Sequence, residues 1–158
     1  VTRRVRLIDF GLSTIWREGD PPLRKRMGSL AYMAPEMLRR PKNGKPCGGY
    51  TRAVDVWALG VVTHAMLAGK LPFRASSDSA LERLLASEGG PRLPAPDELL
   101  LLPPLPGGKA DAASGRQPEE ENGPRDLVMQ MLTADPAQRV AAEAARAHAW
   151  LKQEPPRP

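Results

Sequence analysis

The chain has 158 residues, of which 26% are charged, and a formal net charge of +5, which fits one ordinary globular domain. Its lysines and arginines are scattered apart from one cluster, Arg24-Lys25-Arg26, so the charge does not point to a nucleic-acid-binding protein. The single cysteine, Cys47, excludes an internal disulfide and is compatible with a reducing compartment. The sequence contains no recognisable signal peptide or membrane-spanning segment.

The N-terminal part predicts a short strand followed by a long loop. In residues 1–8, Val5 and Leu7 alternate with arginines, a period-two pattern typical of a strand. The triplet Asp9-Phe10-Gly11 follows, and taken alone it is more often a chance match in a common loop than a functional motif. Residues 12–26 have neither helical nor strand periodicity and contain glycine and two prolines, which predicts a surface loop. Loops of this length are usually functional or disordered.

The run from Thr51 to Gly69 predicts a helix at the centre of the fold. Thr51 is a suitable N-cap, Gly69 suits the left-handed residue after a helix, and Pro72 prevents the helix from resuming. Apolar residues cover most of its circumference, which predicts burial in a core. Asp55 lies in its first turn, where it would either be favoured by the helix dipole or hold a neighbouring loop.

Three further helices are predicted downstream of this element. Residues 78–88 place three leucines on one face, and Pro124 suits the first position of a helix whose apolar stripe begins at Leu127. Residues 141–152 predict a helix with a frayed first turn, because no Ser or Thr cap precedes it, and with Trp150 and Leu151 as anchors.

Residues 89–123 predict a disordered insertion between two of these helices. The segment is rich in proline, glycine and alanine and ends near Glu119-Glu-Glu121, so it buries too little apolar surface to offset its ordering entropy. Pro103 to Pro106 has the composition of a polyproline ligand or of a plain linker, and a linker is the better interpretation.

Two ordered motifs then suggest a family. Residues 28–36 read Gly-Ser-Leu-Ala-Tyr-Met-Ala-Pro-Glu, and with Asp-Phe-Gly upstream they resemble the activation segment of a eukaryotic protein kinase. Two motifs in this order are far more specific than either alone. The predicted central helix supplies a third match, because kinases carry Asp-x-Trp-x-x-Gly there and this chain has Asp55, Trp57 and Gly60.

Three more stretches continue the resemblance in chain order. Residues 66–73 resemble the end of the central helix in the calcium/calmodulin-dependent kinase group. Residues 131–139 end in the arginine that in kinases pairs with the Glu of Ala-Pro-Glu. Residues 147–151 resemble the end of the last kinase helix, with Ala149 in place of proline. The resemblance covers residues 1–151, with 9–36 as the activation segment and 152–158 as a tail. It implies a mainly α fold: the C-lobe of a two-lobe α+β kinase, without the N-lobe and the catalytic loop.

The resemblance also implies roles at the two ends of the activation segment. Asp9 would be a Mg2+ ligand that bridges to the phosphates of ATP, Phe10 would pack toward the N-lobe, and Gly11 would allow the backbone to switch. Gly28 and Ser29 would belong to the substrate-binding turn, with Ser29 touching the catalytic loop.

The other implied roles are mostly structural. Tyr32 would shape the pocket beside the phosphoacceptor of the substrate. Glu36 and Arg139 would form a buried ion pair, and Asp55 would accept hydrogen bonds from the backbone of the catalytic loop. Trp57 and Gly60 would be structural residues of the central helix.

Regulation of the activation segment is also constrained by the sequence. Between Ile15 and Met27 there is no Ser, Thr or Tyr, so we expect that activation does not depend on a phosphate in the middle of this loop. Thr14 and Ser29 are the nearby hydroxyls at which this expectation can be tested. The cluster Arg24-Lys25-Arg26 is either a solvated face or a site that meets acidic groups.

Two functional interpretations follow. In the first, the chain is the C-terminal part of an ATP- and Mg2+-dependent kinase that phosphorylates Ser or Thr in proteins. We then expect it to be inactive alone, because the sequence as written lacks the Gly-rich loop, the strand lysine, the helix glutamate and the His-Arg-Asp loop. In the second, it is a non-catalytic kinase-like binding module. The intact Asp9-Phe10-Gly11 favours the first. No EF-hand pattern occurs in the sequence, so calcium regulation is not implied. The resemblance implies an intracellular protein, cytoplasmic or nuclear, without membrane or nucleic-acid partners.

Overall fold

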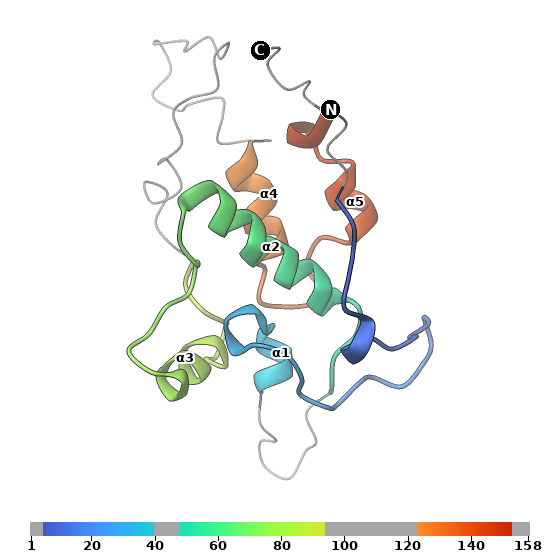
Figure 1. Cartoon of the computed structure of the whole chain (residues 1–158), viewed down its shortest axis with the longest axis vertical. Helices are drawn as coiled ribbons and strands as arrows, with labels where there is room; N and C mark the ends of the chain where they lie inside the picture. The colour runs from blue at the N-terminus through green and yellow to red at the C-terminus, as the bar shows by residue number, and fades with distance from the viewer. Residues whose placement is uncertain (1–4, 40–47, 94–122, 153–158) are drawn as a thin grey trace.

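The computed structural model describes residues 5–39, 48–93 and 123–152, and these are almost entirely helical or irregular (Figure 1). Most of the predicted insertion, residues 94–122, and most of the tail lie outside the described residues. The elements in chain order are η1 (Phe10–Leu12), η2 (Leu30–Tyr32), α1 (Pro35–Leu38), α2 (Ala53–Ala68), α3 (Asp78–Leu85), α4 (Pro124–Met131), α5 (Ala142–Arg146) and η4 (Ala149–Lys152).

Helix α2 is the predicted central helix, and it runs through the middle of the molecule with α4 packed against it (Figure 1). The N-cap of α2 is Arg52, one residue after the predicted Thr51, and its side chain makes no capping hydrogen bond. The Thr51 hydroxyl still accepts from the Ala53 backbone N–H at 3.4 Å. At the other end, Gly69 adopts a left-handed conformation with φ 67° and donates its N–H to the Ala65 carbonyl at 2.9 Å. The predicted cap and stop residues therefore lie within two positions of the observed ends.

The expectation that α2 is buried on all sides is wrong for one face. Trp57 and Val61 are fully buried, and the Trp57 ring stacks on Phe73 with the ring centroids 5.5 Å apart. On the other side, Leu59, Val62 and Met66 are 53%, 40% and 69% exposed. Their spacing places them on one stripe of the helix, so α2 presents an apolar face that the described residues do not cover.

Helix α4 confirms its sequence prediction, whereas α3 begins at the predicted residue but ends at Leu85, and Leu84 of its predicted apolar face is 37% exposed. Ser77 caps α3 by accepting from the Ala80 N–H at 3.2 Å, and Pro124 is the first residue of α4. The four residues of the predicted apolar stripe on α4 are all buried: Leu127, Val128, Met131 and Leu132. They form much of the hydrophobic core, together with residues of α1, α2 and α3.

Three local predictions are wrong. Residues 5–8 form no strand, and Val5 is 97% exposed, because no described segment pairs with them. Pro91 is buried and Leu93 packs against the core, so the first residues of the predicted insertion are ordered. The C-terminal helix breaks into α5 and η4, and Leu151 is exposed where an anchor was expected.

None of the helices within residues 5–39, 48–93 and 123–152 has the length and apolar character that crossing a membrane would require.

The contact between α2 and α4 depends on Gly60. A Cβ added at Gly60 would lie 2.9 Å from the Met131 Cβ and 3.0 Å from the Leu132 Cδ2. A Cβ–Cβ distance of 2.9 Å is essentially never seen, so any side chain here would push the two segments apart.

We therefore expect Gly60→Ala to lower the free energy of unfolding by about 1–3 kcal/mol, the usual cost of overpacking a core. Urea unfolding followed by circular dichroism measures this change. Gly48→Ala is the matched control, because a Cβ at Gly48 meets no atom within 4 Å. Equal stability of the Gly60 and Gly48 variants would contradict the close packing of α2 on α4.

Candidate active-site and substrate-binding segment

Asp9, Phe10 and Gly11 lie at the surface and form a tight turn. Asp9 has φ 61°, a left-handed conformation that Asp tolerates better than most residues, and its Oδ1 accepts from the Gly11 N–H at 3.4 Å. Ser13 closes the turn by donating both its N–H and its hydroxyl to the Phe10 carbonyl, at 3.1 and 2.7 Å. Phe10 is 67% exposed. The Asp9 carboxylate is therefore accessible to a ligand.

The predicted substrate-binding residues follow one another at the surface. Gly28 has φ 101°, which only glycine adopts readily, and Ser29 is exposed. The Ser29 carbonyl accepts from the Tyr32 N–H at 3.0 Å, which begins the short helix η2. Tyr32 is also exposed, whereas Ala34 and Pro35 just beyond it are buried. The turn is thus an exposed segment attached directly to the core.

Glu36 and Arg139 form the buried ion pair that the resemblance implied. The Arg139 Nη1 and Nη2 donate to the Glu36 Oε1 and Oε2 at 2.7 and 2.9 Å, a bidentate geometry. Arg139 also donates from Nη1 to the Ala53 carbonyl and from Nε to the Thr133 carbonyl, each at 2.9 Å. This complete set of partners is what a buried charge pair requires.

Trp57 packs against the same arginine. The Arg139 Cζ lies 5.2 Å from the centroid of the Trp57 ring, within the range of a cation–π interaction. The Trp57 Nε1 is buried and has no hydrogen-bond partner among the described residues. Trp57 therefore acts here through its ring face, which connects the central helix to the ion pair.

His148 joins the last helical segment to α4. Its Nδ1 accepts from the Trp150 N–H at 3.2 Å, so the proton of the neutral ring is on Nε2, which lies 3.0 Å from the Asp126 Oδ2. Asp126 also accepts from Gln130 at 3.1 Å. These contacts give a physical reason for the His-x-Trp pattern near the C-terminus.

Asp55 lies in the first turn of α2, and its side chain reaches the surface. Partial burial raises the pKa of the Asp55 carboxyl above its ordinary value of 3.8. Within the described residues no hydrogen bond or ion pair to this carboxylate is present. A raised pKa marks a carboxylate that has lost water without gaining donors.

The basic cluster meets an acid. Arg26 donates from Nη1 to the Glu82 Oε1 of α3 at 3.2 Å, and Nη2 lies at the same distance. Of the two interpretations of this cluster, contact with an acidic group therefore holds for Arg26. Tyr50, which the sequence analysis missed, donates its hydroxyl to the Lys25 carbonyl at 2.5 Å.

The structure unites some predicted site residues and leaves others apart. Glu36, Arg139 and Trp57 form one cluster. Within the described residues, no hydrogen bond or ion pair connects Asp9, Ser29 or Asp55 to one another. The part of the chain that the structure describes also contains no group of three or more His, Cys, Asp or Glu side chains placed to hold a metal ion.

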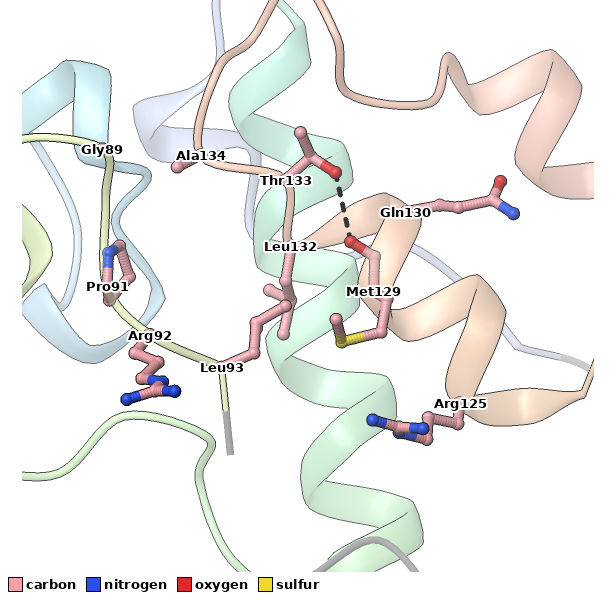
Figure 2. Close-up of a pocket in the computed structure, with 10 residues that line it drawn as sticks. All are labelled: Gly89, Pro91, Arg92, Leu93, Arg125, Met129, Gln130, Leu132, Thr133 and Ala134. Carbon is pink, nitrogen blue, oxygen red and sulfur yellow. Dashed lines mark hydrogen bonds between the residues drawn. The ribbon is translucent and has the colours of Figure 1, made fainter. Parts of the chain in front are cut away.

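A separate pocket lies between the segment after α3 and helix α4 (Figure 2). Pro91, Leu93, Met129 and Leu132 provide apolar lining, while Arg92 and Arg125 enter from the two sides. The Thr133 hydroxyl that lines it donates to the Met129 carbonyl at 3.2 Å, as the dashed line in Figure 2 marks. No predicted site residue lines this pocket, so it is distinct from the activation segment.

Comparison with known proteins identifies the family. The protein kinase domain model matches residues 1–151. The chain is 32% identical over 146 residues to calcium-dependent protein kinase 26 of rice, covering 92% of this chain and 22% of that protein. It is 32% identical over 149 residues to the zebrafish serine/threonine-protein kinase H1 homolog, an alignment that covers 94% of this chain and 29% of that protein. It is also 33% identical over 149 residues to the Arabidopsis CDPK-related kinase 8, which covers 94% of this chain and 20% of that protein.

The fold and the ordered motifs are those of a kinase C-lobe, and the chain belongs to the protein kinase family. It spans less than a third of the length of the curated relatives it matches.

We expect Arg139→Met to lower the free energy of unfolding by about 3–5 kcal/mol, because it leaves the Glu36 carboxylate buried without its partner. Arg26→Met is the matched control: it removes the exposed pair with Glu82 and should cost no more than about 1 kcal/mol. Urea unfolding of the purified variants compares the two. Similar losses at both positions would contradict a structural role specific to Arg139.

Proposed function

We propose that the protein carrying this chain transfers the terminal phosphate of ATP to Ser or Thr hydroxyls of protein substrates, and that this chain supplies the C-terminal part of its kinase domain. The observation that carries the proposal is the intact activation segment: Asp9-Phe10-Gly11 begins it at an accessible turn, and Glu36 fixes its other end through Arg139. Membership of the kinase family supports this function. Relatives named as serine/threonine kinases support the choice of hydroxyl.

Asp9 fits the role of a Mg2+ ligand. Mg2+ takes oxygen ligands, keeps several waters, and is usually held by one or two carboxylates together with substrate phosphates. A single accessible carboxylate such as Asp9 therefore matches the way this ion is bound. When present, Mg2+ neutralises charge on the phosphates of ATP. The Gly11 N–H, which donates to the Asp9 Oδ1 at 3.4 Å, helps to orient this carboxylate, and a Cβ on Gly11 would crowd it at 3.3 Å.

Gly28, Ser29 and Tyr32 would receive the protein substrate. They are exposed and adjacent in space, and the rigid start of η2 holds them next to the buried residues Ala34 and Pro35. Phosphoryl transfer requires a precisely positioned hydroxyl, because positioning and electrostatics provide most of the rate. A surface turn attached to a core is suited to that task.

The exposed face of α2 would be covered in the complete kinase domain. Leu59, Val62 and Met66 form an apolar stripe, and such a stripe usually marks an interaction surface. Asp55 lies at the start of the same helix with a partly desolvated carboxylate. We propose that the catalytic-loop region of the domain covers this face and donates backbone N–H groups to Asp55.

We expect Asp9→Asn to reduce phosphate transfer at least about a hundredfold, because it removes the anionic oxygen that would bind the Mg2+ ion. The fold should not change, since Asp9 is a surface residue whose side chain, within the described residues, accepts only from the neighbouring Gly11 N–H. Transfer of labelled phosphate from ATP to a mixture of Ser- and Thr-containing peptides measures the effect in the full natural protein.

Glu143→Gln is the matched control, because Glu143 is an exposed acid on α5, outside the proposed site. Absence of transfer by the unmodified protein would favour the alternative, a non-catalytic kinase-like binding module. Equal activity of the Asp9 variant and the unmodified protein would rule out the role of Asp9.

A further inference from the structure

The stretch that leads into the substrate-binding turn is tied to the segment before α2. Leu23 and Tyr50 exchange two backbone hydrogen bonds, N–H to carbonyl in each direction at 2.8 Å, and form an isolated antiparallel bridge. The Tyr50 hydroxyl donates to the Lys25 carbonyl at 2.5 Å, and Tyr50 is only 8% exposed. Three hydrogen bonds therefore converge on one tyrosine, and the last of them lies three residues before Gly28.

Gly49 makes this close approach possible. It has φ 79°, and a Cβ on it would lie 2.6 Å from the Leu23 carbonyl oxygen and 2.8 Å from the Pro22 Cβ. Any other residue would be strained in its backbone and would displace the bridge. The sequence around Tyr50 is thus built to hold the loop.

The ion pair between Arg26 and Glu82 adds a further contact from α3, 3.2 Å long. Both side chains are partly exposed, so the pair adds little stability and weakens with salt. The buried hydroxyl of Tyr50 is not subject to such screening. Tyr50 therefore provides the contact whose strength does not depend on ionic conditions.

We propose that Tyr50 is a positioning residue of the kinase: its hydroxyl and its bridge to Leu23 fix the activation segment, and through it Gly28 and Ser29, without a phosphate. This inference rests on the proposed function. Many kinases order this segment by phosphorylating a residue within it. Here residues 15–27 contain no Ser, Thr or Tyr, so no phosphate can fix the middle of the segment, and Tyr50 supplies a constraint there from outside the loop.

Hydrogen exchange at the Leu23 amide in the full natural protein tests the structural part. Tyr50→Phe removes only the hydroxyl, and loss of one such hydrogen bond should raise the exchange rate at Leu23 about fivefold. Gly49→Ala should also accelerate it, by displacing the bridge from the side of the segment before α2. Tyr32→Phe is the matched control and should leave exchange at Leu23 unchanged, since within the described residues no hydrogen bond connects Tyr32 to Leu23 or to Tyr50.

Steady-state kinetics tests the positioning part. Tyr50→Phe should raise KM for a peptide substrate about fivefold and leave KM for ATP unchanged, because the hydroxyl acts on the turn that receives the peptide. A general loss of fold would change both KM values.

Unchanged exchange at Leu23 in both Tyr50→Phe and Gly49→Ala would overturn the proposal. Faster exchange with an unchanged peptide KM would overturn the positioning role. If the unmodified protein transfers no phosphate, the proposed function fails, and the exchange rates alone then decide whether Tyr50 holds the loop.

Discussion

The bidentate ion pair between Glu36 and Arg139 is the interaction on which the rest of this structure depends. It joins residues 103 positions apart in the sequence, and the same guanidinium also binds the carbonyls of Ala53 and Thr133 and faces the ring of Trp57. The end of the activation segment, the start of α2 and the turn after α4 therefore converge on one buried cation. A buried guanidinium is stable only with such a full set of partners. Losing any one of them leaves a charged group unsatisfied.

This arrangement separates the residues that hold the fold from those that would do chemistry. Glu36, Arg139 and Trp57 are buried and fully engaged in packing, whereas Asp9 and Ser29 are exposed at the beginning and near the end of the same segment. The ion pair fixes one end of the activation segment, and the hydrogen bonds to Tyr50 fix its middle. Between them they hold a long irregular loop against the helices without making it part of the core. A loop held in this way can present a substrate-binding turn while remaining accessible.

Sequence patterns predicted what depends on local periodicity and on ordered motifs. The helices beginning near Thr51, Asp78 and Pro124 were predicted from apolar patterns and from residues typical of helix ends, and the pairing of Glu36 with Arg139 came from the kinase resemblance. Of the strand predicted over residues 1–8, the described residues 5–8 are not a strand, because a strand requires a partner and a local pattern does not report one. Tyr50 was missed because its contact with Lys25 is set by a loop crossing and not by any repeat in the sequence. The exposed face of α2 was also not predicted from the pattern itself. An apolar circumference indicates that a helix is buried, but it does not say which segment covers each face.

A double-mutant cycle between Glu36 and Arg139 tests the central account most directly. Unfolding free energies of Glu36→Gln, Arg139→Met and the double variant separate the energy of the pair from the effects of each side chain on its own. If the fold depends on this pair, the coupling energy should be about 2–3 kcal/mol. The double variant should then be about as stable as the less stable of the two single variants. A coupling energy below about 0.5 kcal/mol would mean that the two residues act independently, and would contradict the account.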